Sequence, residues 1–313
     1  MTPSVHLGLD VGGTASRWVA CAADGRVLAR GEATGATGHI FNPSERDRLS
    51  VALHLVGEAL GTAGLRPVSI TAGITGYGSQ ATDAVKALVG DRFGVSADAI
   101  VLVDDIVLAY MAQFEPGEGH LVSAGTGSIG VHVAASGQTI RVGGRGILID
   151  DGGAGSWIAL RALDRVYRTY DLHGSFGPVA GLADSLFAMI GGQEWHDVRQ
   201  FVYGGDRGRI GTLAVAVAQA AKAGDTTALA ILGEAGAELA QLGAALLARA
   251  GDHPIRFVGG VLDLHPVIFA EIGACLPGRA VSRAAGDAAL AGAQLQTGHR
   301  PAWTALLDGP LSA

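Results

Sequence analysis

The stretch Leu7-Gly8-Leu9-Asp10-Val11-Gly12-Gly13-Thr14-Ala15-Ser16 decides the fold of this chain. An apolar strand leads into an acid, two glycines and a hydroxyl, and residues 17–21 and 26–30 again have the pattern of strands. This order predicts an antiparallel meander. Glycines in its first turn allow the backbone amides to approach a bulky anion. We expect Gly12, Gly13 and Thr14 to bind nucleotide phosphates and Asp10 to hold Mg²⁺ through water, with an ordinary hairpin turn as the alternative.

Composition narrows the class of protein. The chain has 313 residues, of which 49% are hydrophobic and 16% charged, so two domains with a large core are expected. A net charge of -7 argues against nucleic acid or an anionic membrane as the main partner. The N-terminus lacks the pattern of a signal peptide, and no run of about 20 residues is free of polar interruption. We therefore expect a cytoplasmic protein without a membrane span.

Cysteine and lysine are both scarce. Cys21 and Cys275 are the only cysteines, which excludes a thiolate zinc site within one chain and fits a reducing compartment. Lys86 and Lys222 are the only lysines, and neither follows a glycine, so the chain has no Walker A loop. Any phosphate site must therefore use backbone amides, hydroxyls and a metal ion.

Strands and helices alternate after the first meander. A helix is expected to begin with Asn42 as its N-cap, Pro43 as its first residue and Glu45 as a capping-box acid. Two apolar strands then end in polar residues, and ligands of such sheets bind at the carboxyl ends of the strands. We expect one shared cleft, lined by Asp10, Thr75, Gly76, Asp104 and Asp105.

The opening pattern is repeated in the second half. Strands are expected at 120–124, 129–134 and 138–142, and the first turn is Gly125-Thr126-Gly127-Ser128. Such a repeat predicts two related domains, over residues 1–116 and 117–313, with the last helix able to pack back on the first. Residues 125–130 also spell G-x-G-x-x-G, but a strand follows where the dinucleotide fingerprint requires a helix.

Taken together, the motifs resemble the actin-like ATPase superfamily, and within it the N-acetylglucosamine kinase branch of the BadF/BadG/BcrA/BcrD group. Asp10 to Thr14 resembles its first phosphate motif, and Ser123 to Ser128 its second. Val258-Gly259-Gly260-Val261 is similar to its adenosine motif. Asp104-Asp105 and the segment 285–289 resemble its connecting helices. The resemblance implies an α/β fold of two RNase H-like domains with a central nucleotide cleft, and an ATP- and Mg²⁺-dependent sugar kinase.

The sugar motif departs from that of the branch. Arg145 stands where the branch has Trp, and Asp151 is followed by glycine instead of glutamate, whereas Trp157 matches. The resemblance implies that Asp151 is a sugar ligand. ROK-type sugar kinases share the first motif, but their zinc-binding cysteine cluster is absent from this sequence.

The resemblance also implies a role for each candidate residue. Asp105 is expected to be the base that takes the proton of the sugar hydroxyl, with Asp104 as the alternative base and simple capping of the next helix as the alternative role of the pair. Because neighbours on a strand point to opposite faces, Asp104 and Asp105 are not expected to share the task. Phosphates are assigned to Gly12, Gly13, Thr14, Gly125, Thr126, Gly127 and Ser128, adenosine to Gly259 and Gly260, and the sugar to Asn42, Thr75, Gly76, Asp105, Arg145 and Asp151.

The expected reaction is phosphorylation of N-acetylglucosamine to its 6-phosphate. Glucosamine or another hexose is the alternative substrate. A protein of another class, an actin- or Hsp70-like ATPase switch or a dehydratase-activator type acting on a protein partner, would hydrolyse ATP slowly whether or not sugar is present. A small-molecule sugar is the expected partner, and the Ala-rich helices of the second half could form a homodimer interface.

Overall fold

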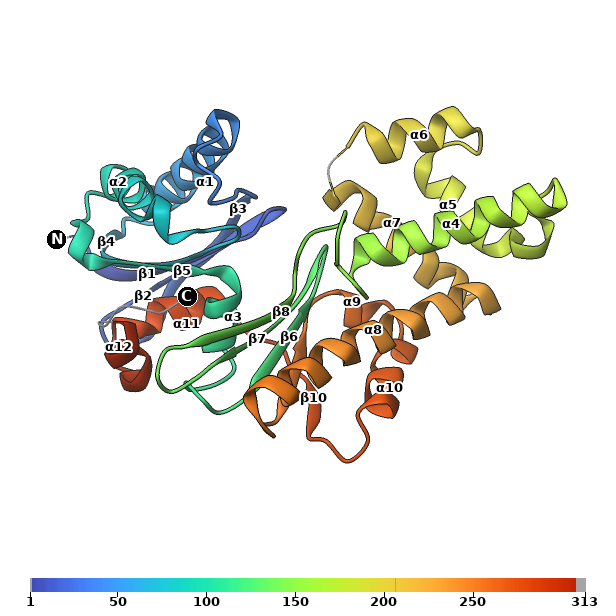
Figure 1. The fold of residues 1–313 in the computed structure, drawn as a ribbon. Coiled ribbons are helices and arrows are strands. Elements are labelled where there is room, and N and C mark those ends of the chain that lie inside the picture. The colour runs from blue at the N-terminus through green and yellow to red at the C-terminus, as the bar shows by residue number, and fades with distance from the viewer. Residues whose placement is uncertain (1, 206, 308–313) are drawn as a thin grey trace. The chain divides into compact units, whose positions relative to one another are not determined.

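The computed structural model describes residues 2–205 and 207–307, which form two compact units (Figure 1). Unit 1 comprises residues 1–119, 133–139 and 286–313, within those described, and unit 2 comprises residues 120–132 and 140–285. The C-terminal residues therefore belong to the first unit, although the rest of the second half lies between them and it in the sequence.

Unit 1 is built on a five-stranded sheet in the order β3-β2-β1-β4-β5. The antiparallel meander is β1 (Ser4–Val11), β2 (Ala15–Cys21) and β3 (Val27–Thr34). The strands β4 (Arg66–Ile74) and β5 (Ile100–Asp104) extend it in parallel with β1. The predicted meander and parallel extension are confirmed.

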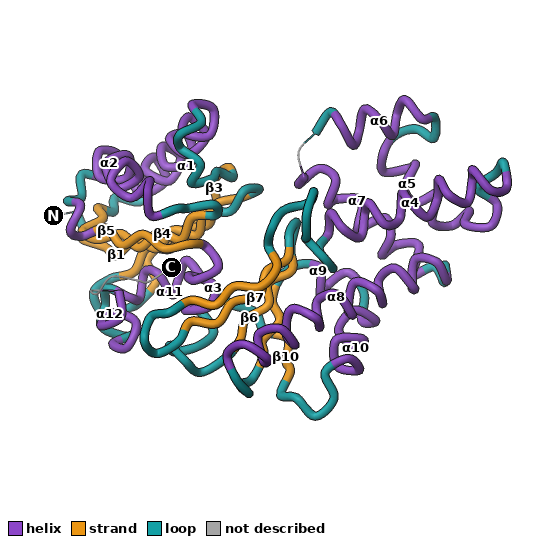
Figure 2. Tube along the Cα trace, viewed as in Figure 1, coloured by secondary structure: helices purple, strands orange, loops and turns teal. Residues whose placement is uncertain are grey.

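Helices cover both faces of this sheet (Figures 1 and 2). On one face α1 (Pro43–Thr62) and α2 (Thr82–Phe93) pack on the odd-numbered side chains of β1. On the other, α3 (Asp105–Met111) and α11 (Ala288–Leu295) pack on the sheet. Gly8 lies on this second face, where a Cβ atom would be 1.8 Å from the carbonyl oxygen of Ala289. Glycine is therefore required for the backbones of β1 and α11 to approach.

Unit 2 repeats the sheet order as β10-β9-β6-β7-β8. Here the meander is β6 (His120–Ala124), β7 (Ser128–Val133) and β8 (Thr139–Gly143), and β9 (Ile255–Val258) and β10 (Val281–Arg283) run parallel to β6. The predicted α/β fold of two related domains is thus confirmed: each has a meander extended by parallel strands.

The helices of unit 2 surround a core rich in alanine and leucine. They are α4 (Gly155–His173), α5 (Ala180–Ile190), α6 (Trp195–Tyr203), α7 (Arg207–Lys222), α8 (Thr226–Ala250), α9 (Val261–Leu264) and α10 (Pro266–Cys275). By length and composition α8 could cross a membrane. Its fully buried residues Ile231, Leu232 and Leu239 lie in the core of unit 2, which is the position of a core helix.

One further helix follows in a tail that showed no clear pattern. It is α12 (Pro301–Leu307), and its Trp303 is fully buried and donates from Nε1 to the carbonyl oxygen of Phe114 at 2.9 Å. Arg300 also donates to the carbonyl oxygen of Met111. These contacts tie the C-terminal segment to the end of α3 within unit 1.

Candidate functional site

The β1–β2 turn presents free backbone amides. The Gly12 amide donates to the carbonyl oxygen of Ala15 at 3.1 Å, and the Gly12 carbonyl accepts from the amide of Ala36 at 3.0 Å. Within the described part of the chain, the amides of Gly13 and Thr14 donate to no backbone or side-chain acceptor. Two consecutive amides without protein acceptors are what an anion-binding turn requires.

The polar residues that end the strands of unit 1 lie at one edge of its sheet. Asp10 pairs in register with Gly73 of β4, and Ile74 pairs with Asp104 of β5. The Thr75 amide donates to the carbonyl oxygen of Val11 at 2.9 Å, which places Thr75 directly beside the β1–β2 turn. Gly76 follows in the left-handed region, with φ of +69°. Asp10, Thr75, Gly76 and Asp105 are therefore brought together, as expected.

Asp104 and Asp105 occupy different positions where β5 meets α3. Asp104 is the N-cap of α3, and its Oδ1 accepts from the amide of Ile106 at 3.3 Å, while Asp105 Oδ1 accepts from the same amide at 2.8 Å. Burial, followed by the neighbouring carboxyl of Asp104, raises the pKa of Asp105 to about 7, and a hydrogen bond from Thr75 opposes the shift. A carboxyl that titrates near neutrality is suited to accept a proton. Asp104 is thus the N-cap by position, but both carboxyls accept from the first free amide of α3.

The expectation that Asp104 and Asp105 point to opposite faces is wrong. Asp104 ends β5 and Asp105 is the first residue of α3, so the alternation of a strand does not apply to the pair. Their side chains are hydrogen-bonded to each other.

Asp10 lies where its ionised form is disfavoured. Burial raises its pKa, the charge of Arg17 lowers it, and the charge of Asp287 raises it again. Its charge also raises the pKa of Asp105, so the two carboxyls are electrostatically close. Oxygen ligands of this kind are those that Mg²⁺ prefers, and a divalent ion would offset their repulsion. The described residues contain no group of three or more His, Cys, Asp or Glu side chains that could hold a metal, so Mg²⁺ at Asp10 stays a prediction.

Asn42 and Glu45 lie at the start of α1. Asn42 is the N-cap, and its Oδ1 accepts from the amide of Ser44 at 3.1 Å. Its capping role is confirmed, and its assignment to the sugar stays a prediction. The predicted capping-box role of Glu45 is wrong, because its carboxylate accepts from the Thr37 hydroxyl at 2.7 Å and from Arg48 at 3.1 Å.

The β6–β7 turn in unit 2 is held by the beginning of α4. The Gly155 amide donates to the carbonyl oxygen of Gly125 at 2.9 Å, and the Ser156 hydroxyl donates to that of Thr126 at 2.8 Å. The Gly125 amide donates to the carbonyl oxygen of Gly127 at 2.9 Å. The amides of Thr126 and Gly127 have no protein acceptor among residues 2–205 and 207–307. Each unit thus offers one turn with two free amides.

Asp151 lies behind the second turn and faces a cavity. A Cβ atom on Gly127 would be 3.0 Å from its Oδ1, and the Ser128 hydroxyl donates to the neighbouring Gly152 carbonyl at 2.7 Å. Burial raises the pKa of Asp151. Its side chain is buried, and Oδ2 has no hydrogen-bond partner among the described residues. Such an orphaned oxygen is costly unless a ligand supplies a donor.

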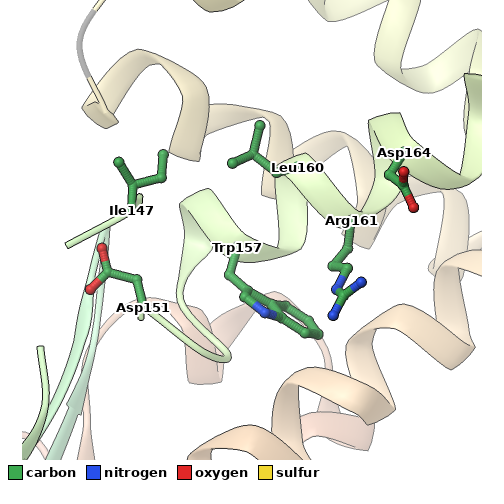
Figure 3. A pocket seen from close by; sticks show the side chains of 6 residues that line it. All are labelled: Ile147, Asp151, Trp157, Leu160, Arg161 and Asp164. Carbon is green, nitrogen blue, oxygen red and sulfur yellow. The ribbon is translucent and has the colours of Figure 1, made fainter. Parts of the chain in front are cut away.

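The cavity beside Asp151 has a volume of about 290 Å³ (Figure 3). In addition to Asp151, its lining comes from the β8–α4 loop and from α4: Ile147, Trp157, Leu160, Arg161 and Asp164. The Arg161 guanidinium lies 5.1 Å from the centroid of the Trp157 ring. A carboxylate, an aromatic face and a cation therefore line the same hollow.

Arg145 does not line the cavity that Asp151 lines. It forms an ion pair with Asp150 at 3.4 Å, and the two residues line another cavity with Glu238 and Arg249. Arg145 is thus part of an ion pair in which both side chains are exposed. Its assignment to the sugar stays a prediction.

Gly259 and Gly260 join β9 to α9. Gly259 has φ of +110°, and a Cβ atom there would be 2.2 Å from the carbonyl oxygen of Ala124 at the end of β6. A side chain is therefore excluded at Gly259 by both conformation and space. A Cβ atom on Gly260 would meet open space. This turn and the β6–β7 turn share one edge of the second sheet, since Ser123 pairs with Val258.

Two residues beside the turns escaped the sequence analysis, Arg48 and Ser156. Arg48 Nη2 donates to the carbonyl oxygen of Gly13 at 3.2 Å. The spacing of Arg48 from Glu45 is that of a helical ion pair and could be predicted from the sequence. Its hydrogen bond to Gly13, 35 residues earlier, could not. Ser156 follows a glycine-rich loop and carried no signal of its own.

Comparison with known proteins agrees with this architecture. The sequence matches the BadF/BadG/BcrA/BcrD ATPase family over residues 7–272. A Clostridium acetobutylicum protein named N-acetylmuramic acid/N-acetylglucosamine kinase is 26% identical over 237 residues, which are 74% of this chain and 76% of that protein. Two solved structures share the fold. A Chromobacterium violaceum protein provisionally named an N-acetylglucosamine kinase has a TM-score of 0.71 at 21% identity, covering 95% of this chain and 100% of that one.

The second is a ROK family glucokinase from Streptomyces griseus, which has a TM-score of 0.59 at 17% identity, with 92% and 97% covered. At these identities the two structures establish the fold alone. The family match covers most of the sequence and includes the β1–β2 turn, the β5–α3 acids and the β6–β7 turn. This chain therefore belongs to the BadF/BadG/BcrA/BcrD ATPase family.

Proposed function

We propose that this protein is an ATP-dependent sugar kinase that phosphorylates a hydroxyl of N-acetylglucosamine. The observation that carries the proposal is the meeting, at one edge of the first sheet, of a glycine turn with free amides, a half-buried Asp10 and Asp105, whose pKa is raised to about 7. The name of the C. acetobutylicum relative and the glucose and AMPPNP bound in the S. griseus glucokinase support the same reaction class.

Each turn has a role in this proposal. The amides of Gly13 and Thr14, and those of Thr126 and Gly127, donate to phosphate oxygens. Gly259 and Gly260 leave room for adenosine. Asp10 would hold Mg²⁺, and the ion would supply positive charge to the phosphate oxygens. Because the chain has no Walker A lysine, backbone amides and the metal carry this charge.

Asp105 acts on the acceptor. It takes the proton of the sugar hydroxyl as the oxygen bonds to the γ-phosphorus and the bond to the leaving ADP oxygen breaks. The Thr75 hydroxyl holds the Asp105 carboxyl, and Asp104 raises its pKa. Asp151 has a buried oxygen without a donor, which suits a sugar hydroxyl. Asn42, Gly76 and Arg145 are the further sugar-binding candidates.

The test is ADP release with ATP and Mg²⁺ across N-acetylglucosamine, glucosamine, N-acetylmuramic acid and glucose. We expect turnover with N-acetylglucosamine and a loss of about 10²–10⁴-fold in Asp105→Asn, with ATP binding retained. Asp104→Asn is the matched control and keeps most of the turnover at pH 8. Slow hydrolysis that no sugar accelerates would instead identify an ATPase switch.

The pH dependence separates the two acids. Asp105 must be ionised to accept a proton, so turnover is expected to rise with pH and to be half-maximal near pH 7 on the acidic limb. Because Asp104 raises the pKa of Asp105, Asp104→Asn should move this limb to lower pH. An acidic limb that stays in place in Asp104→Asn would contradict the assignment of Asp105 as the base.

A second acceptor, N-acetylmuramic acid, is favoured by one observation. Arg161 lines the cavity of Asp151 and forms no ion pair within the described ranges. A guanidinium at this position suits the carboxylate that distinguishes this sugar from N-acetylglucosamine. Arg161→Met should then raise KM for N-acetylmuramic acid alone, with Arg165→Met on the same helix as control. Equal effects on both sugars would remove the carboxylate assignment.

A further inference from the structure

Arg48 connects three segments of unit 1. Its Nη2 donates to the carbonyl oxygens of Gly13 at 3.2 Å and Gly35 at 3.4 Å, and its Nη1 donates to Glu45 Oε1 at 3.1 Å. The other carboxylate oxygen of Glu45 accepts from the Thr37 hydroxyl at 2.7 Å. One guanidinium on α1 thus contacts the β1–β2 turn and the β3–α1 loop.

The contact to Gly13 fixes a peptide plane. In a trans peptide the C=O of one residue and the N–H of the next point in opposite directions. A donor held on the Gly13 oxygen therefore directs the Thr14 amide away from Arg48. That amide is one of the two in this turn that have no protein acceptor in the described part of the chain.

The turn and the β3–α1 loop are in backbone contact. The Ala36 amide donates to the carbonyl oxygen of Gly12 at 3.0 Å. A Cβ atom on Gly35 would be 2.4 Å from the carbonyl oxygen of Gly13. The loop therefore forms the back of the turn, and Arg48 closes the ring of contacts from α1.

Glu45 and Arg48 differ from a simple surface ion pair because Glu45 is mostly shielded from solvent. The Arg48 side chain is 46% exposed, whereas that of Glu45 is 19% exposed. The hydrogen bond from Thr37 is the main cause that lowers the pKa of Glu45, and Arg48 contributes as well. Glu45 is thus ionised and held from both sides, which orients the Arg48 fork toward the two carbonyls.

We propose that Arg48 is a positioning residue that sets the β1–β2 turn for nucleotide binding through its bonds to Gly13 and Gly35. The inference rests on the proposed function in taking this turn as a phosphate site. Arg48 itself contacts no phosphate in this proposal. It acts by holding the Gly13–Thr14 peptide plane, with Glu45 and Thr37 as its support.

The test compares Arg48→Met with Arg46→Met on the same helix. Both variants remove one positive charge, but Arg46 is exposed and its side chain forms no hydrogen bond or ion pair with the described residues. We expect Arg48→Met to weaken ATP binding, measured by calorimetry without sugar, by about 5- to 20-fold. KM for ATP should rise with it, while KM for the sugar and kcat change by less than about threefold. Arg46→Met should match the wild type.

Two milder variants, Arg48→Lys and Thr37→Val, test the same role of Arg48. Arg48→Lys keeps the charge and one donor, so it should recover part of the loss. Thr37→Val leaves Arg48 in place but frees Glu45, and should weaken ATP binding less than Arg48→Met does. If Arg48→Met does not fold, ATP binding by Arg48→Lys and Thr37→Val still tests the proposal. ATP binding equal to that of the wild type in Arg48→Lys and Thr37→Val, or in Arg48→Met itself, would overturn the proposal.

The two proposals fail in different ways. A wild type that binds ATP but phosphorylates no sugar removes the kinase function, and the affinity series still tests Arg48. If the wild type phosphorylates sugar and Arg48→Met binds ATP as tightly as Arg46→Met does, only the positioning role of Arg48 is contradicted.

Discussion

The β1–β2 turn and the β6–β7 turn offer the same pair of free amides but are held by different means. The first is backed by the Gly35 backbone and by Arg48, a half-exposed cation. The second is held by the first residues of α4 through the Gly155 amide and the fully buried Ser156 hydroxyl. A neutral, buried bond is not screened by salt, whereas an exposed charged one is. The same meander can therefore have a turn whose support is sensitive to salt and a turn whose support is not.

The largest effect is expected from the glycine behind each turn. A Cβ atom on Gly35 would be 2.4 Å from the Gly13 oxygen, whereas one on Gly155 would be 3.3 Å from the Gly125 oxygen. Gly35→Ala must displace the first turn, and we expect ATP affinity to fall by about 100-fold. Gly155→Ala should cost much less. Equal losses by calorimetry would show that the two turns are backed alike.

The next effect concerns the acids that accompany the turns. Burial first, and then Asp104, raises the pKa of Asp105 to about 7, so the folded state binds its proton more tightly than the unfolded state does. The wild type therefore loses stability as pH rises from about 4 to about 7. Asp105→Asn should be more stable at pH 8 by on the order of 1–3 kcal/mol, since one pKa unit corresponds to about 1.4 kcal/mol.

Denaturant unfolding of both proteins across this pH range measures the difference. It should vanish below about pH 3, where Asp105 is protonated in both the folded and the unfolded wild type. Burial also raises the pKa of Asp151, so Asp151→Asn should show a gain of the same sign beside the second turn. A gain for Asp105→Asn that does not change with pH would refute the protonation argument.

A smaller effect separates the supports themselves. Ser156→Ala removes a buried hydrogen bond at 2.8 Å, and should lower the free energy of unfolding by about 1–2 kcal/mol. Arg48→Met breaks exposed contacts and should cost less than about 1 kcal/mol of stability, although it weakens ATP binding more. The paired comparison of unfolding and ATP affinity is decisive. The proposal would be contradicted if Arg48→Met cost more stability than Ser156→Ala and Ser156→Ala weakened ATP binding more than Arg48→Met.

The smallest expected effect is that of salt. Between about 0.05 and 0.5 M salt, the ratio of ATP affinity between wild type and Arg48→Met should shrink by about twofold, because the exposed guanidinium is screened. The ratio between wild type and Ser156→Ala should stay constant over the same range. Parallel behaviour of the two ratios would mean that the charge of Arg48 has no part in holding the turn.

Much of the fold could be predicted from local pattern. Alternating apolar residues in β1 and β2, the glycines between them and the repeat from His120 specify two meanders, because strand and turn preferences are local. Periodicity could not place α12, since its Trp303 is buried by contact with Phe114 from another part of unit 1. The local pattern places Asp104 and Asp105 together at a strand end, but the hydrogen bond between them depends on α3 starting at Asp105.

The sequence by itself therefore determined the class of the fold, the two glycine turns and the acids at the strand ends, since each is written in neighbouring residues. Only the tertiary structure decided that Arg48 contacts the first turn, that Ser156 holds the second, and that Arg145 and Asp151 line different cavities. These facts depend on side chains meeting across long separations in sequence. Such meetings are set by the packing of whole elements, which no local pattern encodes.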